Sequence, residues 1–165
     1  MTFWLLIPFL ALVAIAQVTL LPLISIAGFK PDLALMVVVS WGMLAPIGEA
    51  AQWGFIVGIF LDLASGLPFG IHMLVLTSIG ILVGLGQATF FHGNLVAPPI
   101  AMIASTLLHS ILILGILAFF NWRIDWNDYL LRITLPTAIL NTFAMPLVYF
   151  PLQQLQHRLL PQMEV

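Results

Sequence analysis

Few residues of this chain can do chemistry, and the most informative is Asp62, in the apolar segment 58–70. Ser65-Gly66 follow Asp62, and glycine is the usual left-handed residue just past a helix end. The carboxyl group is therefore expected in the last turn of a helix, where the negative end of the helix dipole disfavours it. A cationic partner, hydrogen-bond donors or protonation can each relieve that cost.

Candidate partners for Asp62 come from two places in the sequence. The cations expected on the same face are Lys30, Arg123 and Arg132, and the local donors are Ser65 and the amides of the 66–70 turn. Three roles stay open: a solvated helix end, a structural tie between the loop and its neighbours, and a direct role at a ligand, proton or partner site. Ionisable residues inside membranes often mark such sites.

His109 and Asn141 lie near the middle of long apolar runs. In lipid each needs a hydrogen-bond partner. The pair is expected either to bond between helices or to line a polar cavity, and Gln17 and Thr19 can join either arrangement.

Other chemistries find no support. There is no Gly-x-Ser-x-Gly, His-Glu-x-x-His or phosphate-cradling loop. A dyad of Ser105 or Ser110 with a histidine is conceivable, but nothing in the spacing favours it. There is no cysteine, and no two of the four histidines share a helical turn, which argues against a zinc site. The net charge of -2 offers no basic patch for nucleic acid. We predict no catalytic residue, no metal and no cofactor.

The composition places these residues in a membrane. The 165 residues are 62% hydrophobic and 6% charged, against about 25% charged in soluble domains. The apolar runs are continuous and too long for barrel strands, so helices must satisfy the backbone. The sequence predicts one all-α integral membrane domain over residues 1–165.

Six membrane-spanning helices are expected, or five if the short second and third segments are not both full crossings. Their ranges are 3–24, 31–45, 50–65, 71–91, 95–120 and 130–150. The first lacks a basic n-region and is read as a retained helix. Residues 152–160 have leucines on one face, which predicts a short interfacial helix.

Glycines recur at a four-residue spacing in two of these segments. The pairs are Gly54 with Gly58 and Gly80 with Gly84. This spacing stacks glycines on one helix face, where two backbones can approach closely. The two interpretations are packing within the bundle and a face for a partner helix.

With six crossings, most of the charge falls on one side of the membrane. The connectors after spans one, three and five share that side with seven of the ten charged residues: Lys30, Asp32, Asp62, Arg123, Asp125, Asp128 and Arg132. Counting basic residues alone, the positive-inside rule would make this side cytoplasmic.

Two motifs carry a family resemblance. Lys30-Pro31-Asp32-Leu33 opens the second span, and the 58–70 segment contains an Asp-Leu-x-Ser-Gly core. Together with the chain length and the uncharged first span, they resemble MreD, the rod shape-determining membrane protein of bacteria. The resemblance covers nearly the whole chain.

The resemblance implies a six-helix fold like the substrate-binding component of energy-coupling-factor vitamin importers. It implies a bacterial inner-membrane protein with both termini cytoplasmic, contrary to the count of basic residues. It also implies a non-catalytic scaffold that binds MreC, and indirectly other elongation proteins, in peptidoglycan synthesis. The family-like positions, expected to shape outward loops and a groove for MreC, are Pro31, Asp32, Asp62, Ser65, Gly66 and Gly70.

Two other functions remain open. One is a vitamin-like small-molecule carrier with a cavity lined by His109 and Asn141. The other is a proton-coupled transporter that uses Asp62.

Overall fold

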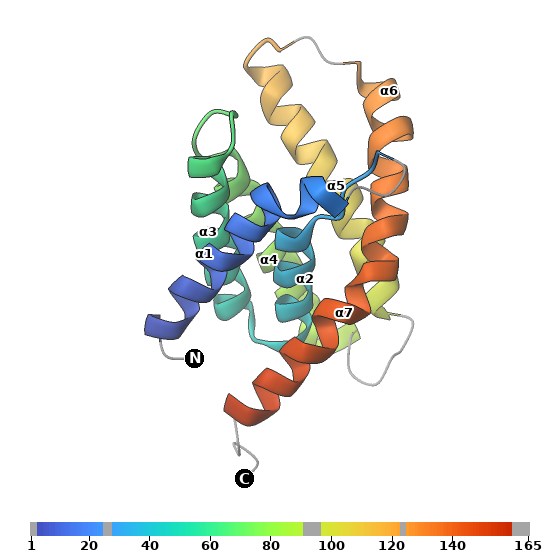
Figure 1. The fold of residues 1–165 in the computed structure, drawn as a ribbon. Helices are drawn as coiled ribbons and strands as arrows, with labels where there is room; N and C mark the ends of the chain where they lie inside the picture. Colours follow the sequence, from blue (N-terminus) through green and yellow to red (C-terminus); the bar gives the residue numbers. More distant parts are fainter. Residues whose placement is uncertain (1–2, 25–27, 91–96, 123–124, 160–165) are drawn as a thin grey trace.

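The computed structural model describes residues 3–24, 28–90, 97–122 and 125–159. Its main helices are α1 (Phe3–Thr19), α2 (Leu33–Leu44), α3 (Ile47–Ala64), α4 (Ile71–Phe90), α5 (Ala97–Phe119) and α7 (Leu135–Leu159) (Figure 1). A 3-10 turn, η1 (Leu21–Ile24), follows α1, while α6 (Trp126–Tyr129) and a π turn, η2 (Leu130–Thr134), lead into α7. The all-α prediction is confirmed.

The helices also confirm a polytopic membrane protein. Three stretches are long and apolar enough to cross a membrane: α3, α5 and the continuous run Trp126–Gln156. Shorter apolar helices cover Leu5–Thr19, Leu33–Leu44 and Ile71–Gln87. Residues 152–159, expected as a separate interfacial helix, continue α7. Residue 160 lies outside the described residues, and the position of this segment at the membrane surface stays a prediction.

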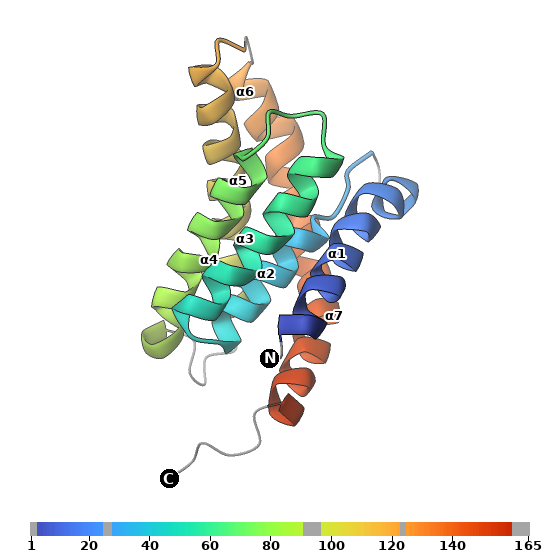
Figure 2. The same cartoon turned by 90° about the vertical axis from the view of Figure 1, so that its left-hand side faces the viewer.

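Helix α2 is the centre of the bundle. It contacts α1, α3, α4, α5 and α7 (Figure 2), and every residue from Ala34 to Met43 is buried. The ring of Trp41 stacks on Trp53 of α3 with centroids 4.1 Å apart. With 12 residues, α2 is only about 18 Å long, well short of a hydrocarbon core of about 30 Å. Both of its ends therefore need partners inside the protein.

Side chains from α1 and α7 supply those partners. At the start of α2, the Leu33 amide donates to Oε1 of Gln17 at 2.7 Å, and the Asp32 amide donates to Oδ1 of Asn141 at 2.8 Å. At the other end, Nε2 of Gln156 donates to the Leu44 carbonyl. Because α7 bonds to both ends of α2, backbone groups that a short helix would expose to lipid are satisfied internally.

Helices α3 and α4 form a close hairpin through their glycines. A Cβ at Gly54 would lie less than 3.0 Å from backbone atoms of Leu76, and one at Gly58 less than 3.0 Å from backbone atoms of Met73. Gly80 and Gly84 of α4 approach the backbones of Ala50 and Ile47 in the same way. The four predicted packing glycines therefore lie where two helix backbones meet.

Candidate functional site

Asp62 lies in the last full turn of α3 but bonds to the first turn of α4. Its Oδ2 accepts from the amides of Gly70 and Met73, each at 3.0 Å, and its Oδ1 accepts from the His72 amide at 2.9 Å. Nδ1 of His72 lies 2.9 Å from the same Oδ1, and the Asp62 side chain is 0% exposed. The positive end of the α4 dipole offsets the unfavourable end of the α3 dipole.

Hydrogen-bond donors thus stabilise Asp62, but they are not all the expected ones. The Gly70 amide lies in the predicted turn, where φ of +103° explains the glycine. The proposed Ser65 donor is wrong: its hydroxyl is buried and has no partner among the described residues. Lys30 and Arg132 form no ion pair with Asp62. Nε of Arg132 instead lies 2.6 Å from Oδ1 of Asp128. Arg123 lies outside the described residues.

A second polar cluster surrounds Asp32 at the start of α2. Oδ1 of Asp32 accepts from the Leu35 amide at 3.0 Å, and Oδ2 lies 3.8 Å from Nδ1 of His109 on α5. Asn141 of α7, which accepts from the Asp32 amide, also donates to Oγ1 of Thr106 at 3.3 Å. His109 and Asn141 therefore belong to one interhelical cluster.

The remaining polar residues divide between this cluster and their own helices. Gln17 joins the cluster at the start of α2, whereas Thr19 donates to the Ile15 carbonyl of its own helix. The sequence did not single out Thr106, which joins this cluster, or Gln156, which bonds to the opposite end of α2. Their only signal was a hydrogen-bonding side chain within a long apolar helix.

Three aspartates share one structural task. Asp32 caps α2, Asp62 caps α4 from the preceding helix, and Asp125 caps α6 by accepting from the Asn127 and Asp128 amides. In Figure 1 the α3–α4 loop and α6 lie at one end of the bundle, and α7 ends at the other. Three of the aspartates expected on one face of the membrane therefore cap the starts of helices.

The Asn141 bridge gives a testable prediction. Replacing Asn141 by Leu keeps the approximate size but leaves the Asp32 amide without an acceptor. We expect a loss of about 1–3 kcal/mol in unfolding free energy, measured as thermal or denaturant unfolding in nanodiscs. Thr142→Val is the control, because the one hydrogen bond that Thr142 makes among the described residues goes to the Ala138 carbonyl of its own helix. If both variants unfold alike, the bridge does not stabilise α2.

No catalytic or metal-binding arrangement is found in the part of the chain that the structure describes. No group of three or more His, Asp or Glu side chains there could hold a metal ion. Ser105 lines a groove between α4 and α5. What the geometry provides is helix ends held by hydrogen bonds and an open apolar groove.

The comparisons with known proteins identify the family. The family model described as rod shape-determining protein MreD matches residues 1–159. Comparisons with curated proteins and with solved structures give no match. With nearly the whole chain matched and an all-helical membrane fold, the chain belongs to the MreD family of rod shape-determining membrane proteins.

Proposed function

We propose that this protein is a non-catalytic scaffold that binds MreC in the bacterial inner membrane and so helps to organise peptidoglycan synthesis during elongation. The observation that carries the proposal is the family match over residues 1–159. The use of Asp32 and Asp62 as helix caps supports it, because both carboxylates accept backbone amides at helix starts.

The loop between α3 and α4 is the best candidate for an outward contact surface. Asp62 fixes it through the Gly70 amide, and Phe69 beside that anchor is 64% exposed. A rigid loop that presents an aromatic side chain loses little conformational entropy when a partner binds. Pro31, Ser65 and Gly66 complete the proposed surface around the two caps.

The proposed orientation places both termini in the cytoplasm and the three capped connectors outside. The capping roles of Asp32, Asp62 and Asp125 support this orientation indirectly, because these acidic residues are explained by the helix starts that they cap. The positive-inside rule points the other way, but the chain has only four Lys and Arg residues on which to apply it. A cysteine-accessibility assay with Gly66→Cys and Gly48→Cys checks it. A membrane-impermeant thiol reagent should label the Gly66→Cys variant in intact cells, and the Gly48→Cys variant only after the cells are permeabilised.

The proposal is tested by purifying the protein with MreC. We expect co-expressed, tagged MreC to retain this chain in mild detergent and to bind it again in nanodiscs, and deletion of the gene to abolish rod shape. A purified, folded protein that shows no affinity for MreC in either environment would contradict the proposal. A polytopic membrane protein of similar size from the same cells serves as the specificity control.

Two alternatives have weaker support. A vitamin-like carrier needs free polar groups in a cavity, whereas Asn141 is bonded to Asp32 and Thr106. A vitamin that co-purifies in native mass spectrometry would favour it. Proton transport through Asp62 requires that Asp62→Asn abolish function while preserving expression.

A further inference from the structure

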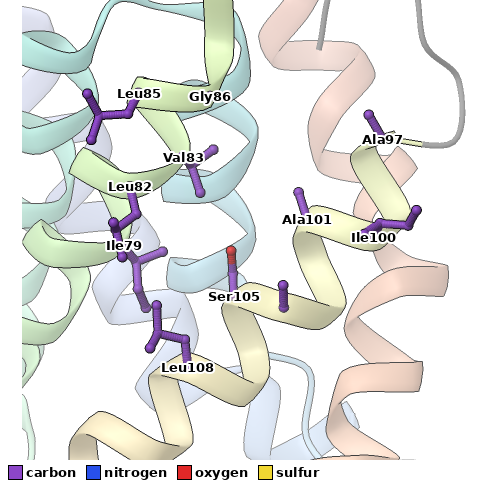
Figure 3. A pocket seen from close by; sticks show the side chains of 11 residues that line it. Ile79, Leu82, Val83, Leu85, Gly86, Ala97, Ile100, Ala101, Ser105 and Leu108 are labelled. Carbon is purple, nitrogen blue, oxygen red and sulfur yellow. The ribbon is translucent and has the colours of Figure 1, made fainter. Parts of the chain in front are cut away.

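An open groove lies between the second half of α4 and the first half of α5 (Figure 3). Its volume is about 620 Å³, and its lining is almost wholly apolar. Large aliphatic side chains such as Leu82 and Leu85 form the α4 wall, whereas Ala97, Ala101, Ala104 and Ser105 form much of the α5 wall. We call this the α4–α5 groove.

The small residues of the α5 wall follow a helix-packing pattern. Ala97, Ala101 and Ser105 are spaced four residues apart, so they lie along one face of α5. Small residues at this spacing let a second helix approach closely in a membrane. Within the chain, α3 and α4 use glycines for the same purpose, but no helix of the described residues fills the α4–α5 groove.

Ser105 adds a polar signal to this face. The residue is 5% exposed, and Figure 3 shows its hydroxyl on the side of α5 that faces the groove. The neighbouring Thr106 donates to the Met102 carbonyl of its own helix at 2.9 Å, whereas the Ser105 hydroxyl has no hydrogen bond to any residue that the structure describes. Because a hydroxyl without a partner is costly in hydrocarbon, an occupant that offers an acceptor is favoured over a lipid acyl chain.

We propose that the α4–α5 groove receives a membrane-spanning helix of the partner protein. The partner helix packs large aliphatic side chains against the small α5 wall and presents a backbone carbonyl or polar side chain to the Ser105 hydroxyl. The contact lies in the half of the membrane nearest the α4–α5 connector. This inference rests on the proposed function, which supplies MreC as the partner.

Disulfide cross-linking tests the contact directly, because the chain has no cysteine of its own. Ala104→Cys places a thiol in the groove, and Phe143→Cys places one on the exposed face of α7, where Phe143 is 81% exposed. Each is paired with single cysteines along the membrane-spanning segment of a cysteine-free MreC and oxidised in native membranes. Cross-links from Ala104→Cys should recur every three to four MreC positions, and Phe143→Cys should give none.

The outcomes separate this inference from the function on which it rests. If MreC co-purifies but Ala104→Cys cross-links no more than Phe143→Cys, the groove assignment is overturned and the scaffold proposal stands. If Ala104→Cys cross-links only to a second copy of this chain, the groove is instead a self-association surface and the assignment again fails. If MreC does not bind at all, both proposals fail.

Substitutions that fill the groove provide a second measurement. Ala104→Phe should weaken MreC binding in nanodiscs at least about tenfold, because added volume at a close contact costs more than 1 kcal/mol. Ile103→Phe, on an exposed neighbouring position outside the lining, should leave affinity unchanged. Ser105→Ala should weaken binding about fivefold, and Ser78→Ala, whose hydroxyl donates to the Leu74 carbonyl, should not. Unchanged affinity with Ala104→Phe and a normal unfolding temperature would overturn the inference.

Discussion

Replacing Asp62 by Ala is expected to lower the unfolding free energy by roughly 3 kcal/mol or more. The substitution removes the acceptor for the Gly70, His72 and Met73 amides and the contact with the His72 ring. It also frees the loop that these bonds hold, so MreC capture should fall with stability. Thermal unfolding in nanodiscs, followed by tryptophan fluorescence, measures the first effect, and co-purification yield measures the second.

Two other caps are matched controls for Asp62. Asp32→Ala removes one amide acceptor at the start of α2, and Asp125→Ala removes an exposed cap of the short α6. Each substitution should lower the unfolding free energy by about 1 kcal/mol. The loss should be smaller for Asp125→Ala, because water can replace the exposed carboxylate as the acceptor. If Asp62→Ala unfolds no earlier than Asp32→Ala, the bonds across the α3–α4 turn are not the main support of that loop.

Gly58→Ala is expected to destabilise the α3–α4 hairpin by about 1–3 kcal/mol. The added methyl would meet the Met73 backbone, which cannot move away as a flexible side chain can. Because Gly54 makes the same kind of approach to Leu76, the Gly54→Ala/Gly58→Ala double variant should lose the folded hairpin. Unfolding temperature and protease resistance in detergent report both effects.

Gly115→Ala distinguishes steric crowding from a general sensitivity to glycine replacement. Gly115 lies in α5, and a Cβ there would meet no atom within 4 Å. Alanine has the higher helix propensity, so this variant should be unchanged or up to about 1 kcal/mol more stable. Equal destabilisation by Gly115→Ala and Gly58→Ala would contradict the close-approach explanation.

Much of the fold could be predicted because its signals are local. Long apolar runs predict membrane helices, since lipid offers the backbone no hydrogen bonds. The four-residue glycine spacing marks a face for close approach, and the structure places Gly54 and Gly58 against α4. The length of α2 is harder to predict because hydropathy does not reveal that a helix of 12 residues is enclosed by five others.

The polar sites were predicted less completely because their partners are far away in the sequence. Asn141 is 109 positions from Asp32, and Gln156 is 112 positions from Leu44. No spacing rule links residues so far apart. Ser65 shows that closeness in the sequence is no guarantee of a bond. It lies three residues after Asp62, yet its hydroxyl makes no bond to Asp62, because the Asp62 side chain points toward the start of α4.

The sequence by itself determined the lipid environment, the helical class and the close-packing glycine faces, and it placed Asp62 near the end of a helix, since composition and short spacings carry that information. Only the tertiary structure decided what Asp62 bonds to, how the ends of α2 are satisfied and where an unfilled groove remains. Those features depend on which helices are neighbours, and the arrangement of helices is set by packing over the whole chain rather than by any local segment.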